Sequence, residues 1–278
     1  MSFANELLTL CLIPLAVSVA LALLVRWLGG KPQVAWAAAV GVAFIAGNFA
    51  LASRTSFARG IRALLAPSEA PDWLPHAVLL ALGVTIFAAY APRRWRLAAA
   101  ALAGLLSIGV PARLLAGNLA QQWSGLEKLL HLALLGATLA LAWLLLSAAR
   151  DYELPRLRQI LIVLVSLGAA VVTTLSGSFT FGRLCGVVAA ALSGAALVSP
   201  RGLSGAAGVV IFSLGGIIIL CVFYAGLHPA GAALLFASLA ASAGRLPDLA
   251  SNWPTWQQAA LRTALCLLPL TIVLAASL

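Results

Sequence analysis

The sequence predicts an all-α fold: a polytopic bundle of about ten transmembrane helices in one integral membrane domain, residues 1–278. Of these residues, 63% are hydrophobic and only 9% are charged, with a mean hydropathy of +1.07. The apolar runs approach the roughly 20 residues that a helix needs to cross a bilayer. They are rich in Leu and Ala and do not alternate with polar residues, which argues against a membrane β-barrel.

Ten apolar segments lie between breaking residues. The seventh is short, and the ninth is shorter than a crossing normally requires, so the prediction allows eight to ten spans. The predicted spans are residues 7–28, 34–52, 75–92, 97–115, 129–149, 159–176, 183–199, 203–226, 230–243 and 259–277.

The longest predicted loop contains an amphipathic pattern at residues 55–66. Its apolar positions recur at helical spacing, Arg59 and Arg62 lie off that face, and Pro67 ends it. The apolar positions are Phe57, Ile61, Leu64 and Leu65. This pattern is typical of a helix that lies flat in the headgroup region. We interpret it as a cap on the bundle; a gate over a cavity is the alternative.

The distribution of basic residues predicts the orientation. With ten spans and the N-terminus outside, inner loops hold ten of the 17 basic residues and outer loops hold six. The inner set is Arg26, Lys31, Arg93, Arg94, Arg96, Arg150, Arg156, Arg158, Arg201 and Arg245. Because cytoplasmic loops carry excess Lys and Arg, both termini are expected on the extracytoplasmic side of a bacterial inner membrane.

Several classes of function find little support in the composition. The net charge of +10 is scattered between apolar runs, so the lipid bilayer is the expected partner and nucleic acid is not. The four cysteines lie in apolar segments without CxxC spacing, and we find no metal-ligand set, cofactor fingerprint or catalytic motif. Seven of the eight tryptophans lie at segment ends as interfacial anchors, and only Trp143 lies within a span.

A ridge of small residues and a cluster of hydroxyl residues stand out in the second half of the chain. A small residue recurs at every fourth position to form a ridge suited to close helix packing, at Gly182, Gly186, Ala190 and Gly194. Such a ridge packs inside the bundle or in a dimer, and we favour the bundle. The hydroxyl residues Thr173, Thr174 and Ser176 lie just before it. They form either an ordinary turn or unwound backbone that lines a site.

Four further polar residues are candidates for a cavity or site. Asn48 and Arg113 lie within predicted spans, where polar groups are costly and often functional. Glu127 and His131 are four residues apart and share a helix face, so the carboxylate is expected to orient the imidazole. Since no carboxylate lies at membrane depth, histidines are the side chains expected to titrate near neutral pH.

Two functions remain open, and an enzyme is a distant third. A small-molecule permease would have a cavity lined by Asn48, Thr173, Thr174 and Ser176. A non-catalytic subunit of a larger membrane complex would have a packed bundle and an exposed surface for its partner proteins. The compact arrangement of spans slightly favours the permease.

Overall fold

A computed structural model of the chain describes residue 6 and residues 8–116, 123–148, 154–199, 202–243 and 253–277. Within these ranges the chain is helical and contains no β-strand, so the predicted all-α class is confirmed. Nine helices in the same ranges are long and apolar enough to cross a membrane, and a shorter apolar helix precedes the last of them. The protein is therefore a multi-pass integral membrane protein.

The elements follow one another with short connections. In chain order they are η1 (Leu8–Leu12), α2 (Ile13–Trp27), α3 (Pro32–Ala52), α4 (Phe57–Leu65), η2 (Ala70–Trp73), α5 (Leu74–Tyr90), η3 (Arg93–Trp95), α6 (Arg96–Leu114), α8 (Gly125–Ser147), α9 (Pro155–Leu175), α10 (Phe179–Val198), η4 (Leu203–Ala206), α11 (Ala207–Val210), η5 (Ile211–Gly215), α12 (Gly216–Tyr224), α13 (Pro229–Ala243) and α14 (Thr255–Ser277).

Local sequence sets where several helices begin. Proline occupies the first turn of α3 and α9, where its missing N–H costs nothing. Ser124 and Glu127 form a capping box that starts α8 at Gly125, four residues before the predicted span. Ser178 caps α10, and the turn before it contains Gly177 in the left-handed region with φ of 100°.

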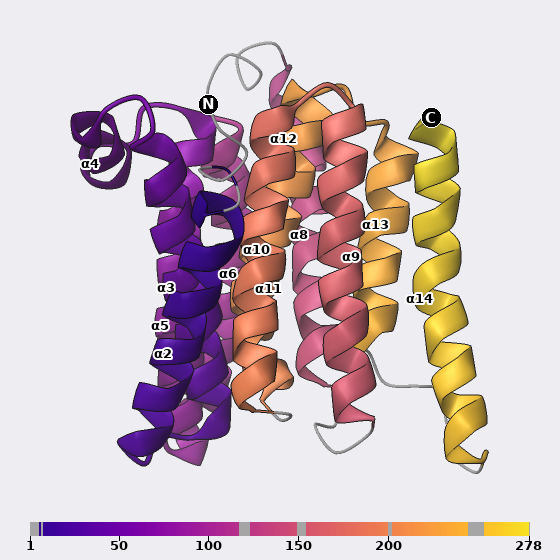
Figure 1. The fold of residues 1–278 in the computed structure, drawn as a ribbon. Coiled ribbons are helices and arrows are strands. Elements are labelled where there is room, and N and C mark those ends of the chain that lie inside the picture. Colours follow the sequence, from indigo (N-terminus) through magenta and orange to yellow (C-terminus); the bar gives the residue numbers. More distant parts are fainter. Residues whose placement is uncertain are drawn as a thin grey trace.

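The ends of the helices define two ends of the bundle. Figure 1 shows the start of η1 and the end of α14 at the same end, here the upper end, while the α2–α3 and α5–α6 turns lie at the lower end. Helix α13 runs beside α9 and α14. Its 15 residues extend only about 22 Å, which is shorter than a typical hydrocarbon core. The basic residues Arg150, Arg201 and Arg245 lie outside the described residues.

The core of the bundle is built around the segment η4–α12. In its most apolar window, 89% of the residues are buried, against 22% in α8 and in α14. This central segment packs against α3, α5, α6 and α8, while α10 joins α2 and α3 to α9. A π-helical turn, Ile211–Gly215, interrupts it at mid-depth. The middle of the protein is therefore filled by apolar side chains.

The ridge on α10 packs closely at some positions only. A Cβ added to Gly194 would lie 2.7 Å from the Leu15 carbonyl oxygen, and one added to Gly182 would clash with Thr174. Ala190 is half-buried. At Gly186 an added Cβ would meet no atom within 4 Å, which differs from the predicted close packing at that position. The ridge faces two different neighbours, α2 and α9, and open space lies between them.

Helix α4 lies in the loop where the amphipathic pattern of residues 55–66 predicts a helix. Figure 1 shows it at the upper end, viewed nearly along its axis while the spans run vertically. Ser56 caps it, and Gly60 is buried close to Phe49 and Ser53 of the α3 end. Phe57 and Leu65 are 67% and 76% exposed, so its apolar face is turned away from the protein.

Candidate functional site

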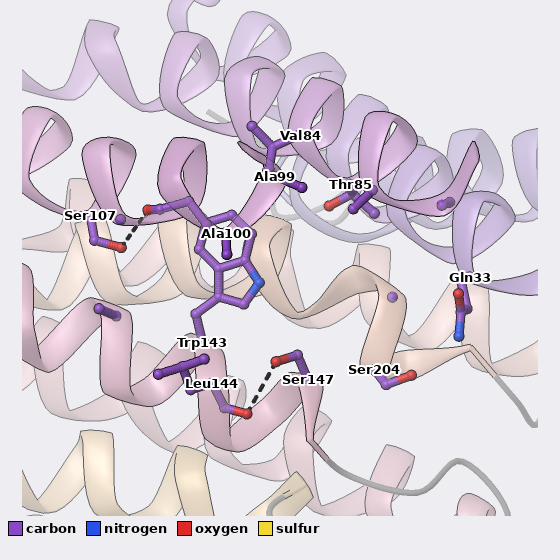
Figure 2. Close-up of a pocket in the computed structure, with 16 residues that line it drawn as sticks. Gln33, Val84, Thr85, Ala99, Ala100, Ser107, Trp143, Leu144, Ser147 and Ser204 are labelled. Carbon is purple, nitrogen blue, oxygen red and sulfur yellow. Dashed lines mark hydrogen bonds between the residues drawn. The ribbon is translucent and has the colours of Figure 1, made fainter. Parts of the chain in front are cut away.

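A cavity of about 510 Å³ lies in the lower half of the bundle, and we call it the Trp143 cavity. Four helices and a turn form it: the start of α3, the second half of α5, the first half of α6, the second half of α8, and η4. Its lining residues are Gln33, Val84, Thr85, Ala88, Ala89, Ala99, Ala100, Ala103, Gly104, Ser107, Ala140, Trp143, Leu144, Ser147, Ser204 and Gly205. Figure 2 shows the labelled side chains from these elements around the Trp143 ring.

Small residues create this space. On α6, Ala99, Ala100, Ala103 and Gly104 line the wall, and a Cβ added to Gly104 would meet nothing within 4 Å. Ser107, the deepest residue on α6, lies 11 residues from the start of that helix, or about 16 Å along its axis. That depth is about half of a hydrocarbon core. The cavity therefore extends from the lower end to about the middle of the membrane.

Trp143 is the largest side chain in the lining, and the central segment holds its ring in place. A Cβ added to Gly208 would lie 2.7 Å from the indole, so glycine at that position lets the ring approach the α11 backbone. The ring also meets Phe212 edge-on, with centroids 5.4 Å apart and planes at 89°. Phe212 lies in the π-helical turn. The tryptophan is thus a fixed aromatic wall.

Three of the hydroxyl groups in the lining donate to their own helices. Thr85 donates to the Ala81 carbonyl oxygen at 2.9 Å, Ser107 to that of Ala103 at 2.9 Å, and Ser147 to that of Leu144 at 3.1 Å. The last two bonds are drawn in Figure 2. With its proton used in this way, a hydroxyl oxygen keeps lone pairs that accept hydrogen bonds. The cavity therefore offers acceptors to a ligand with O–H or N–H groups.

The lining contains no Asp, Glu, Lys, Arg or His residue. The nearest described cation in sequence to a lining residue is Lys31, at the lower end. Its ammonium donates to the Ala89 carbonyl oxygen and lies 4.9 Å from the Tyr90 ring centroid. This contact ties the start of α3 to the end of α5 beside the cavity. The site suits an uncharged molecule with an apolar body.

The predicted site residues are not brought together in this cavity. Asn48 lines a second, smaller cavity at the upper end. Arg113 is exposed at the end of α6, and its guanidinium lies over the Trp73 ring at 4.0 Å from the centroid. That contact is a cation–π interaction at the upper end.

The hydroxyl-rich segment lines neither cavity. Thr173 donates to the Ala169 carbonyl oxygen at 2.8 Å, Thr174 to that of Ala170 at 2.7 Å, and Ser176 to that of Val172 at 2.9 Å. These residues belong to the last turn of α9 and its C-cap. The structure therefore differs from the expectation of a cavity lined by Asn48 together with these three residues.

Glu127 and His131 lie one turn apart on α8, but the carboxylate does not hold the imidazole. The Glu127 side chain accepts from the Ser124 backbone N–H at 2.8 Å as part of the capping box. The His131 Nδ1 is instead 2.8 Å from the Glu127 carbonyl oxygen. The imidazole stacks on Trp123, with centroids 4.3 Å apart and planes at 11°.

The burial of two polar residues near the lower end was not predicted from the sequence. Arg158, expected in a loop, and Gln159, the first residue of the predicted span 159–176, are only 2% and 5% exposed. Gln159 donates to the Ser199 carbonyl oxygen at 3.0 Å, and the Trp36 indole donates to the same oxygen at 3.1 Å. This carbonyl joins α9 and α3 to the end of α10. Periodicity gave no signal for it, because it depends on contacts between distant segments.

The Trp143 cavity itself had one sequence signal. Trp143 was the one tryptophan placed within a span, away from the interfacial positions of the others.

Comparison of the chain with protein-family models, curated proteins and solved structures gives no match. The geometry of the cavity is therefore the basis for a functional assignment.

Proposed function

We propose that the protein is a permease for a small uncharged solute, which binds in the Trp143 cavity. The observation that carries this proposal is an uncharged cavity of about 510 Å³ that reaches mid-membrane from one end of the bundle. That volume lies within the range of small-molecule sites, which are mostly apolar with a few placed polar groups. A solute with an apolar face for Trp143 and donors for Thr85 and Ser107 fits this lining.

The orientation is part of the proposal. Lys31, Arg93 and Arg94 belong to short turns at the lower end, and such turns are typical of the cytoplasmic side. We place the protein in a bacterial cytoplasmic membrane with the Trp143 cavity toward the cytoplasm. Both termini then lie outside. In this arrangement the structure represents an inward-facing state.

The alternative is a non-catalytic subunit of a larger membrane complex. It draws on the central segment, which fills the middle of the bundle with apolar side chains. In that case the Trp143 cavity would take a lipid chain or the side chains of a partner protein. Solute flux through the purified protein alone separates the two functions.

The test uses purified protein in liposomes and a panel of uncharged solutes: nucleosides, glycosides and blocked amino-acid amides. We expect at least one solute to raise the melting temperature and to exchange across the liposome membrane. Gly104→Phe should abolish both effects by filling the cavity, since Gly104 faces open space. Gly83→Phe is the matched control, because Gly83 also has no neighbour within 4 Å and does not line the cavity.

Two outcomes of this test would contradict the proposal. If flux and thermal stabilisation are absent for the whole panel, the subunit function is favoured. If both occur and are the same in Gly104→Phe and Gly83→Phe, the solute uses another route through the protein. Trp143→Ala should weaken binding of a true ligand, whereas Trp256→Ala, on the 69%-exposed ring of α14, should leave it unchanged.

A further inference from the structure

The smaller cavity, of about 210 Å³, lies at the upper end of the bundle. It is formed by the end of α3, the loop and helix α4, η2 and the start of α10. Its lining residues are Asn48, Leu51, Ala52, Arg54, Thr55, Arg59, Glu69, Pro71, Asp72, Thr180, Arg183 and Leu184. We call it the arginine cavity. Three guanidinium groups and two carboxyl groups line it, in contrast to the uncharged Trp143 cavity.

A carboxylate from elsewhere in the chain meets two of these arginines. Glu6, just before η1, contacts the Arg183 guanidinium of α10, and its Oε1 lies 3.6 Å from Arg54 Nη1 at the end of α3. The Arg54 side chain is only 11% exposed and also donates to Thr9. Two guanidinium groups from distant segments thus converge on one carboxylate, and this arrangement is typical of an anion site.

The two carboxylates that line the arginine cavity, Asp72 and Glu69, are bound to groups other than Arg54 and Arg183 in the contacts described here. Asp72 Oδ2 accepts from the backbone N–H groups of Ser68 and Glu69 at 3.3 and 3.1 Å. Glu69 Oε1 lies 3.5 Å from Arg59 Nη2, and both side chains are more than half exposed. Thr180 and the buried Asn48 add neutral hydrogen-bonding groups to the lining. Glu6 therefore contacts both Arg54 and Arg183, whereas Asp72 and Glu69 are held by other groups.

We propose that the arginine cavity binds an anionic group, a carboxylate or a phosphate, between Arg54 and Arg183, and that Glu6 is its built-in competitor. Planar guanidinium groups match the oxygen geometry of both anions. A ligand anion would replace the Glu6 carboxylate between the two guanidinium groups. The upper end lies at headgroup level, so the anion has two sources: a lipid phosphate or a free solute. This inference is independent of the proposed permease activity.

The first experiment removes the competitor. Inorganic phosphate and acetate are titrated into purified protein in an uncharged detergent, at constant ionic strength, with binding followed by calorimetry. A short tether gives an effective concentration on the order of millimolar, so Glu6→Gln should bind phosphate at least about tenfold more tightly than the parent protein. Glycerol, a neutral probe, should bind neither protein. Equal phosphate affinity in both proteins would overturn the proposal.

The second experiment locates the site. In the Glu6→Gln background, Arg183→Gln should remove phosphate binding, and Arg183→Lys should weaken it by losing the planar fork while keeping the charge. Arg62→Gln is the matched control, because Arg62 is exposed on α4 and does not line the cavity. Phosphate binding that survives both Arg183 changes, or that falls equally in Arg62→Gln, would contradict the assignment. Melting temperatures of all variants exclude misfolding.

A third arm identifies the source of the anion. Dihexanoyl phosphatidate, a soluble lipid, is compared with inorganic phosphate in the Glu6→Gln protein. Tighter binding of the lipid, lost in Arg183→Gln, supports a headgroup phosphate. Equal or weaker binding of the lipid supports a free anion. Binding of the lipid that does not depend on Arg183, with no binding of phosphate, would show attachment to the apolar surface and would overturn the anion site.

Discussion

Gly186 and Gly194 lie about two turns apart on α10, yet their surroundings differ completely. The spacing of the small residues predicted close helix packing along the whole ridge. It could not predict which neighbour each position would meet. The same limit applies to Thr173 and Thr174, whose hydroxyls were expected in a cavity and are bonded to their own helix. Composition predicts what groups are present, but not which surface they face.

This contrast on α10 gives a prediction with an internal control. Gly194→Ala should lower the free energy of unfolding by about 1–3 kcal/mol, since its Cβ would lie 2.7 Å from both the Leu15 carbonyl oxygen and the Ser18 Cβ. Gly186→Ala has room and should leave stability unchanged or raise it by up to about 1 kcal/mol through helix propensity. Denaturation in detergent measures both. Equal effects would mean that α10 does not pack against α2 as described.

A second residue-scale prediction concerns the contact between the same two helices. The Ser18 hydroxyl is fully buried and donates to the Ala191 carbonyl oxygen at 2.6 Å. Ser18→Ala should cost about 1 kcal/mol, the usual net value of such a bond. Ser193→Ala is the control, because its hydroxyl bonds only within α10, to Ala189. A larger loss in the control would contradict the importance of the interhelical bond.

Elements are the scale at which the sequence was most informative. Long apolar runs fix the existence of the spans, and proline and serine fix several helix starts, because both act through local backbone chemistry. The structure extends the fifth predicted span to Gly125 for the same reason. The π-helical turn within the central segment had no such signal. Phe212 of this turn meets the Trp143 ring, a contact between distant segments that a local pattern does not encode.

Helix α4 carries the prediction at this scale. Its apolar residues Phe57, Ile61 and Leu65 are exposed in the protein alone, so we expect them to enter the headgroup boundary. A nitroxide label at Leu65→Cys in nanodiscs should be more accessible to oxygen than to a water-soluble nickel chelate. The label at Arg62→Cys should show the reverse. A preference for the nickel chelate at both positions would place α4 in water and contradict the interfacial position.

For the whole molecule, the sequence predicted the class and the approximate number of crossings, but a cavity lined by Asn48 together with Thr173, Thr174 and Ser176 is not among those of the structure. Both cavities arise from the relative placement of helices far apart in the chain, and hydropathy contains no information on that placement. The described residues also differ in charge between the two ends. All four acidic residues within the described ranges, Glu6, Glu69, Asp72 and Glu127, lie at the upper end. The described lower-end turns contain Lys31, Arg93 and Arg94, and these basic residues are the basis of the proposed orientation; Asp151, Glu153 and Asp248 lie outside the described residues.

The topology prediction follows from this asymmetry. A phosphatase fused after Leu278 should be active outside the cytoplasm, and a fluorescent protein fused after a truncation at Gly30 should be fluorescent inside it. A phosphatase placed after Gly30 should be inactive, and a fluorescent protein placed after Leu278 should not be fluorescent. A fluorescent fusion at Leu278 with an active phosphatase at Gly30 would invert the molecule and turn the Trp143 cavity outward. Both sites on one side would mean that a segment such as α13 does not cross.

The burial of the central segment has a consequence for biogenesis. Leu203–Tyr224 and Leu8–Trp27 are the most apolar of the described spans, yet most of the surface of Leu203–Tyr224 meets other helices and not lipid. Apolarity is therefore not needed there to face the bilayer in the finished protein. It is needed earlier, when each helix leaves the translocon as a separate unit and must partition into lipid alone. The neighbours that enclose it include α13, which is synthesised later. Part of the surface of the central segment therefore faces lipid until α13 is inserted, so its burial is completed only after α13 is made.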